Sequence, residues 1–197
     1  MIEYFINTFI KFFFILTPFF VLSTFLSMTS DFEEKQRKKT AVKVTISTII
    51  ASLIIYFIGN QIFSLFGITI NSFRIGTGAL LFLSAYSLVK GGDKIHISED
   101  EQDIAVVPLS IPVAIGPATT GAILILGSER NYLLEKSIGV SALILAIIAM
   151  GSFLYMGSLI EKIFKKQGLI ILSKLTGLIV AAISAQMIMT GIVEFLK

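Results

Sequence analysis

The apolar segment of residues 107–126 contains Pro108, Pro112 and Pro117, and Gly116 precedes the last of them. Proline has no backbone N–H and clashes with the preceding turn, so an unbroken helix here would leave carbonyl groups without a donor. In hydrocarbon such groups are tolerated only where they are buried in protein or face a water-filled cavity. The segment therefore predicts a broken helix within a larger membrane domain, a feature typical of transport sites.

The composition is that of a membrane protein. Of the 197 residues 55% are hydrophobic and 15% are charged, whereas soluble domains have about 25% charged residues. Six segments are long and apolar enough to cross a bilayer core of about 30 Å as helices: residues 4–28, 44–66, 73–89, 104–126, 137–160 and 169–195. Residues 1–197 are therefore expected to form a single all-α, polytopic membrane domain in contact with the lipid bilayer.

Several classes of function are disfavoured. The chain has no cysteine and a net charge of +3, and its basic residues lie beside apolar segments, so neither thiol chemistry nor a nucleic-acid partner is predicted. The only histidine, His96, lies in a polar loop near Glu99 and Asp103, which we interpret as solvated, with metal or pH sensing as the alternative. We recognise no catalytic set, metal cluster or phosphate loop, so no enzyme activity and no cofactor is predicted.

Lys and Arg are distributed unevenly between the loops. Eleven lie in or beside the first, third and fifth loops: Lys35, Arg37, Lys38, Lys39, Lys43, Lys90, Lys94, Lys162, Lys165, Lys166 and Lys174. Five belong to the other side: Lys11, Arg74, Arg130, Lys136 and Lys197. Because positively charged loops stay in the cytoplasm, this bias predicts that both termini are non-cytoplasmic.

Glycine and proline recur at matching places in the two halves of the chain. The pair Gly67 and Gly76 is repeated by Gly168 and Gly177 at an offset of 101 residues. Pro18, in the first segment, likewise precedes Pro117 by 99 residues. Residues 4–89 and 104–196 would then be two inverted three-helix repeats, each with a proline-broken first helix. The alternative is chance, because both residue types are common in membrane helices.

Hydroxyl groups beside the two breaks are candidate solute ligands. The pathway candidates at the breaks are Thr17, Pro18 and Ser23 in the first half, and Gly116, Pro117, Thr119 and Thr120 in the second. The positive end of a half-helix can bind a carboxylate, and hydroxyls can donate or accept without a buried charge. The alternative is a simple kink, which we favour for Pro108 and Pro112 but not for the Gly116-Pro117 pair.

Few polar residues lie deep within the predicted membrane segments. Lys11 lies seven residues into its segment, roughly 10 Å at 1.5 Å per residue, and we interpret it as snorkelling, with a solute or ion role as the alternative. Arg74 and Glu194 are interpreted as interface anchors. Gln186 is expected to bond across helices or to line the pathway.

Small residues recur every four positions along the last segment, at Gly177, Ala181 and Ala185. Such a stripe allows helix backbones to approach closely. We predict that it packs within the monomer, together with Gly76, while a homo-oligomer contact is the alternative.

Several of these motifs together resemble the MarC family of bacterial membrane proteins. They are Val107-Pro108-Leu109 with Pro112, Gly116-Pro117 and Thr119; Phe73-Arg74-Ile75-Gly76; Ser173-Lys174-Leu175-Thr176-Gly177; and the carboxyl-terminal residues 186–194. The resemblance implies six spans in a bacterial inner membrane. A related group is described as neutral amino acid transporters, and the family is similar to the LysE-type exporters. The family usually has Asn-Pro where this chain has Thr17-Pro18.

The function expected from these features is secondary transport of a small polar solute, such as a neutral amino acid, by alternating access. The alternative is a membrane protein with a structural or regulatory role and no translocated solute.

The charge bias makes a prediction about topology. In intact cells Lys38→Cys, Lys94→Cys and Lys165→Cys should be shielded from an impermeant thiol reagent, whereas Asn131→Cys and Lys197→Cys should be labelled. The natural chain has no cysteine, so the background is clean. A reversed pattern would contradict the orientation, and a mixed pattern would contradict the six-span count.

Overall fold

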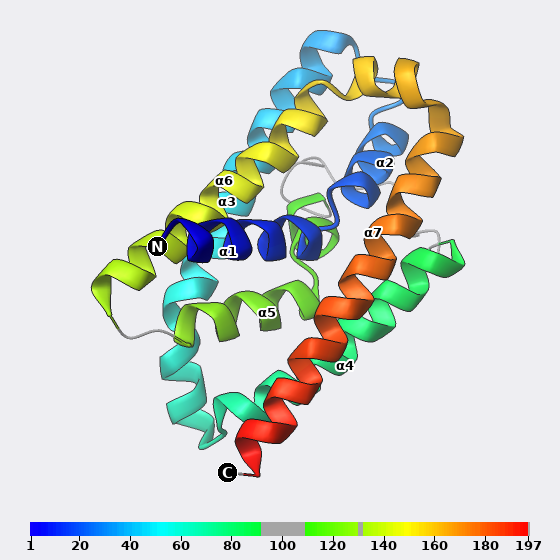
Figure 1. Cartoon of the computed structure of the whole chain (residues 1–197). Helices are drawn as coiled ribbons and strands as arrows, with labels where there is room; N and C mark the ends of the chain where they lie inside the picture. Colours follow the sequence, from blue (N-terminus) through cyan, green and yellow to red (C-terminus); the bar gives the residue numbers. More distant parts are fainter. Residues whose placement is uncertain (92–108, 130–131, 197) are drawn as a thin grey trace.

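A computed structural model describes residues 1–91, 109–129 and 132–196, and this part of the chain is almost entirely helical (Figure 1). The helices are α1 (Ile2–Ile15), α2 (Pro18–Met28), α3 (Glu34–Phe66), α4 (Ile70–Lys90), α5 (Pro117–Ser128), α6 (Leu133–Tyr155) and α7 (Gly157–Phe195), with a short π-helix, η1 (Leu109–Ala114), before α5. The predictions for Pro108 and for the loop around His96 lie outside the described residues.

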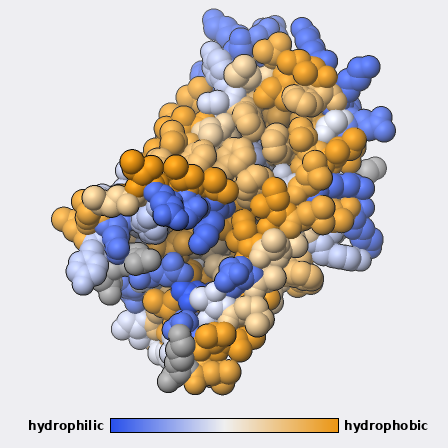
Figure 2. Space-filling view, in the orientation of Figure 1, coloured by the Kyte–Doolittle hydropathy of each residue, from blue (hydrophilic) through white to orange (hydrophobic). Residues whose placement is uncertain are grey.

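The predicted all-α membrane fold is confirmed. Five elements are long and apolar enough to span a bilayer: Ile2–Met28, which comprises α1 and α2, then α3, α4, α6 and α7. The fourth predicted segment is represented by η1 and by α5, which has only 12 residues. Apolar side chains cover much of the outer surface (Figure 2), with Ile46, Ile50 and Ile54 of α3 all more than half exposed. Such a surface implies contact with lipid.

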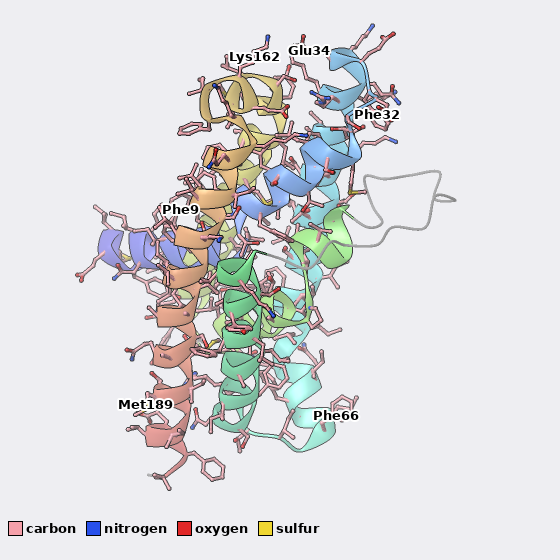
Figure 3. All side chains as sticks on the ribbon, turned by 90° about the vertical axis from the view of Figure 1, so that its right-hand side faces the viewer. Phe9, Phe32, Glu34, Phe66, Lys162 and Met189 are labelled. Carbon is pink, nitrogen blue, oxygen red and sulfur yellow. The ribbon has the colours of Figure 1, made fainter. Side chains whose placement is uncertain are left out.

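Two helices extend beyond their predicted segments. α3 begins at Glu34 rather than at residue 44, because its polar first turns are rich in good helix formers and Glu34 pairs with Lys38 at 2.6 Å. α7 begins at Gly157 and is interrupted at Lys165, whose φ of 53° and ψ of 170° are not helical. Glu34 and Lys162 lie at the same end of the molecule, opposite Phe66 (Figure 3).

The long helices pair in opposite directions. α3 and α6 pack side by side and run antiparallel, and so do α4 and α7 (Figure 1). The shorter α1 and α5 lie across these long helices, and α2 turns away from α1 at the first break (Figure 1). One core cluster includes Phe12, Leu22 and Phe25 from α1 and α2 with Leu143 and Met150 from α6. Val113 and Ala114, beside the second break, belong to the same cluster, so both breaks lie inside the bundle.

The contact between α4 and α7 is lined by small residues at a spacing of seven. On α7 these are Gly177, Ser184 and Gly191, and they face Ala85, Gly78 and Asn71 of α4 in antiparallel order. The Ser184 hydroxyl donates to the Gly78 carbonyl at 2.6 Å. Small residues and polar bonds of this kind bring helix backbones together in membranes.

The predicted four-residue stripe lies only partly in this contact. Gly177 lies in it, Ala181 is half-buried against the core cluster that includes Leu81 and Ala85, and Ala185 is exposed. A step of four residues turns about 40° around a helix of 3.6 residues per turn, whereas a step of seven drifts only about 20°. Gly76 has no neighbour within 4 Å of where a Cβ would lie. Gly78 is the packing glycine of α4.

These two glycines give a matched test of the helix contact. A Cβ at Gly78 would lie 3.2 Å from the Ser184 carbonyl oxygen and 2.6 Å from Ile188 Cγ1, so Gly78→Leu is expected to destabilise the protein by about 1–3 kcal/mol through overpacking. Gly76→Leu, which has free space, should cost little. The measurement is thermal unfolding in one detergent, and equal losses of stability would contradict the assigned contact.

Candidate functional site

The first break lies between α1 and α2, at Thr17. Pro18 occupies the first turn of α2, where its missing N–H costs no hydrogen bond. Thr17 itself has φ 47° and ψ 57°, the left-handed conformation. For a β-branched residue this conformation is an outlier that costs on the order of 1–2 kcal/mol. A residue held in such a conformation points to a functional role.

The second break lies between η1 and α5. The Ile115 N–H donates to the Ser110 carbonyl at 2.9 Å, an i to i−5 bond that widens the backbone spiral. Gly116 then adopts an extended conformation, and Pro117 opens α5. π-Helical turns are rare and are frequent at functional sites. In both halves, therefore, proline starts a new helix after a non-helical residue.

The two breaks are connected by a hydrogen bond. The Thr119 hydroxyl, in the first turn of α5, donates to the Ile15 carbonyl at the end of α1, with an oxygen–oxygen distance of 3.4 Å. In an unbroken helix that carbonyl would accept from the backbone four residues later. A side chain of the second half thus satisfies a carbonyl exposed by the first break.

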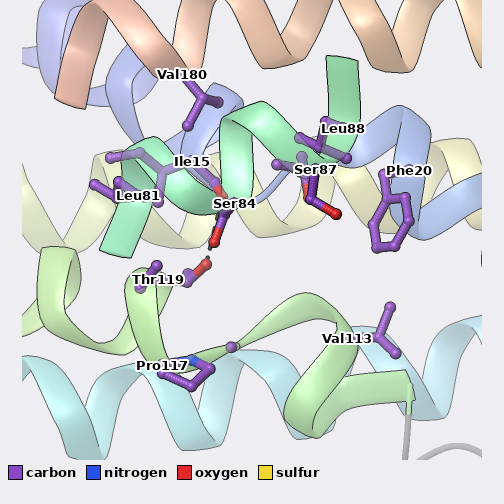
Figure 4. A pocket seen from close by; sticks show the side chains of 13 residues that line it. Ile15, Phe20, Leu81, Ser84, Ser87, Leu88, Val113, Pro117, Thr119 and Val180 are labelled. Atoms are coloured by element: carbon purple, nitrogen blue, oxygen red, sulfur yellow. Dashed lines mark hydrogen bonds between the residues drawn. The ribbon is translucent and has the colours of Figure 1, made fainter. Parts of the chain in front are cut away.

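The breaks line a pocket of about 340 Å³, which is within the usual size range of small-molecule sites. Figure 4 shows Ser84 and Ser87 of α4 opposite Pro117 and Thr119. The lining hydroxyls are those of Thr17, Ser84, Ser87 and Thr119. The remaining lining residues are Ile15, Phe20, Leu81, Leu88, Val113, Gly116, Pro117, Ala118 and Val180. None of these residues is charged. We call this cavity the break pocket.

Two further pockets lie on either side of it along the helices. The basic pocket, of about 440 Å³, is lined by Ser23, Leu26, Ser27, Ser30, Arg37, Glu161, Lys166, Leu169 and Ile170. The mixed-charge pocket, of about 490 Å³, is lined by Lys11, Ile15, Arg74, Leu126, Glu129, Ala182, Ile183, Gln186, Met187 and Thr190. Along α7 the three pockets follow in the order basic, break and mixed-charge. Ile15 lines both the break pocket and the mixed-charge pocket.

The structure brings four of the predicted site residues into the break pocket: Thr17, Gly116, Pro117 and Thr119. Pro18 is buried next to Thr17. Thr120 does not line this pocket, although its N–H bonds to the Gly116 carbonyl at 2.8 Å. Ser23 lies in the basic pocket and Gln186 in the mixed-charge pocket. The four predicted residues of the break pocket therefore all lie at, or within three residues of, a break.

Sequence reasoning missed Ser84 and Ser87. Both residues lie on the side of α4 that faces the breaks. Their spacing of three residues places them on one face of a helix, and this spacing was the sequence signal that could have indicated them. Arg74 was predicted to be an interface anchor, but it is only 9% exposed and pairs with Glu129 at 2.6 Å. Its partner is 55 residues away in the sequence. Among the described residues, no three His, Cys, Asp or Glu side chains group as a metal site would require.

Comparison with known proteins gives similarity along the whole chain. Residues 2–196 match the family described as MarC family integral membrane protein. UPF0056 membrane protein MJ1677 of Methanocaldococcus jannaschii is 32% identical, over 97% of this chain and 97% of that protein. UPF0056 membrane protein YhcE of Escherichia coli is 29% identical, over 93% and 89%. No solved structure matches the chain.

The strained backbone at the first break makes a prediction. Thr17→Gly should raise the free energy of unfolding by about 1 kcal/mol relative to Thr17→Ala, because only glycine adopts a positive φ without penalty. Both variants lack the hydroxyl, so their difference isolates the backbone conformation. Thermal unfolding in detergent measures the effect, and a less stable glycine variant would contradict the left-handed conformation.

Proposed function

The chain belongs to the MarC family of integral membrane proteins, and we propose that it is a secondary transporter of a small polar solute such as a neutral amino acid. The observation that carries this proposal is the break pocket. Two interrupted helices from different halves of the chain meet there and are joined by the Thr119 hydroxyl at the Ile15 carbonyl. Interrupted helices at such a meeting point are a recurring form of solute site in transporters.

The chemistry of the break pocket suits a small solute without net charge. Thr17 and Gly116 are the N-cap residues of α2 and α5, and both line the cavity. The amino-terminal N–H groups of a helix and its dipole favour a carboxylate. Hydroxyl oxygens can accept hydrogen bonds from an ammonium group. A zwitterion would thus find both kinds of partner, and the pocket itself contributes no charge.

The series of three pockets supports a path rather than an isolated cavity. α7 contributes Lys166 to the basic pocket and Thr190 to the mixed-charge pocket. A helix rises 1.5 Å per residue, so these residues are about 36 Å apart, comparable with a hydrocarbon core of about 30 Å. A structural or regulatory membrane protein, which is the second candidate function, has no need for polar cavities in series.

The helix directions support alternating access. α3 and α6 run in opposite directions, as do α4 and α7 (Figure 1), which is the relation expected of inverted repeats. We propose that residues 4–89 and 104–196 are such repeats and move relative to each other around the break pocket. We further propose an inner-membrane location with non-cytoplasmic termini and no catalytic activity.

Transport assays on a matched pair of threonine variants test this function. In sealed liposomes Thr119→Val should lower uptake of the transported neutral amino acid, because loss of one hydrogen-bond partner at a binding site costs about 1–3 kcal/mol. Thr120→Val, one residue away and outside the pocket lining, should transport normally. Ser84→Ala and Ser87→Ala should lower uptake as Thr119→Val does.

Protein abundance in the liposomes is the control for folding. If the natural chain moves none of a panel of labelled neutral amino acids, the proposed function fails. If transport occurs but the Thr119→Val and Thr17→Val variants match the natural chain, the break pocket is not the solute site.

A further inference from the structure

We infer that the mixed-charge pocket is a second binding site, which takes the carboxylate group of a small organic solute. The onward path of that solute to the break pocket rests on the proposed function, whereas binding at this site does not. Four segments that are far apart in the sequence form the pocket: Lys11 comes from α1, Arg74 from α4, Glu129 from the C-cap of α5, and Gln186 and Thr190 from α7.

The arginine in this pocket is held in place by its neighbours. One terminal nitrogen of Arg74 donates to a Glu129 carboxylate oxygen at 2.6 Å, and the other donates to the Asn71 side-chain oxygen at 3.2 Å. The Arg74 side chain is 11% exposed, while that of Glu129 is 33% exposed. The guanidinium is therefore the fixed partner, and the carboxylate is the one with room to move. An incoming carboxylate can share or replace Glu129 on the planar guanidinium, which suits this geometry.

The pocket has more positive than negative charge. Its described lining includes Lys11 and Arg74 but only one carboxylate, that of Glu129. Lys11 has no ion pair within the described part of the chain. A lysine within a membrane segment is costly and marks a functional site when it faces a cavity. A bound carboxylate would supply the missing negative charge.

Neutral groups complete the site. The Gln186 amide lies in hydrogen-bond contact with the Thr190 hydroxyl, at 3.2 Å. Both groups line the same cavity as the two cations and can donate to an oxygen anion. Apolar Leu126, Ile183 and Met187 form the rest of the wall beside Ala182, so the pocket can also hold a short apolar side chain.

This site and the break pocket share one lining residue, Ile15. Ile15 is 3% exposed. The Ile15 carbonyl accepts a hydrogen bond from the Thr119 hydroxyl. A shift of Ile15 would therefore alter both the first break and the lining that the two pockets share. The mixed-charge pocket is thus positioned to hold the solute before or after it occupies the break pocket.

Thiol chemistry gives a direct test, because the natural chain contains no cysteine. Ala182→Cys places one thiol in the pocket lining. Its rate of modification is measured in lipid nanodiscs with an anionic reagent, sulfonatoethyl methanethiosulfonate, and with a cationic one, trimethylammonioethyl methanethiosulfonate. The ratio of the two rates reports the sign of the local potential. We expect Lys11→Met to lower the anion-to-cation ratio about fivefold and Glu129→Gln to raise it by a similar factor.

Lys174→Met is the matched control, since Lys174 is exposed on α7 and does not line the pocket; it should leave the ratio unchanged. In the natural background, propionate should slow modification of the introduced thiol, and propionamide, which has the same shape without the charge, should not. Lys11→Met should abolish that protection. A ratio that is insensitive to Lys11→Met, or equal protection by propionate and propionamide, would overturn the carboxylate site.

The two proposals fail separately. Charge-dependent labelling and propionate protection without transport in liposomes would leave the carboxylate site standing and refute the transporter. Transport of amino acids without propionate protection would leave the transporter standing and refute the carboxylate site. Lys11→Met removes an exposed group, and Glu129→Gln keeps a side-chain oxygen that can accept a hydrogen bond from Arg74. Both variants are therefore expected to fold, and the test does not depend on replacing the buried Arg74.

Discussion

A carbonyl group released from a helix in hydrocarbon costs several kcal/mol until it finds a donor. Pro18 and Pro117 interrupt one helix in each half of this chain. The Thr119 hydroxyl donates to the Ile15 carbonyl at 3.4 Å, so the second break helps to complete the first. This requirement brings two sequence-distant segments into the centre of the bundle. The polar atoms that accompany the breaks then face a common cavity, because the apolar surface outside offers them no partner.

The helices around the breaks differ in how firmly they are held. α4 and α7 meet through small residues at a seven-residue spacing, and the Ser184 hydroxyl bonds to the Gly78 carbonyl. Thr17, by contrast, is held in a left-handed conformation that an L-residue rarely adopts. α4 and α7 therefore pack closely against each other, while backbone strain lies at Thr17, where α1 turns into α2, and at Lys165, where α7 is interrupted. In the proposed mechanism, the relative movement of the two repeats would begin at the junction of α1 and α2.

The sequence predicted the features that follow from local chemistry. Proline lacks an N–H wherever it occurs, so both breaks were predictable, and apolar length was sufficient to predict the other spans. Contacts between distant residues were not predictable in this way. Arg74 was predicted to be an anchor because it lies at the start of the third predicted segment, and its partner Glu129 is the C-cap residue of α5, 55 residues away in the sequence. The seven-residue period of the contact between α7 and α4 could not be predicted from α7 alone, because the period depends on the partner helix.

The distribution of charge along the three pockets has a physical cause that bears on mechanism. Lysine, arginine and glutamate side chains line the two outer pockets, whereas the break pocket between them is lined by hydroxyls and helix ends and by no residue of these types. A charge fixed at the centre of a bilayer would be expensive, whereas partial charges on backbone amides stabilise a solute without that cost. In the proposed transport cycle, the cations of the mixed-charge pocket would attract a carboxylate, and the helix ends of the break pocket would receive it. The carboxylate of the solute would then pass from the full charges of Lys11 and Arg74 to the partial charges of the helix ends. It would be bound more weakly in the break pocket and could dissociate from it.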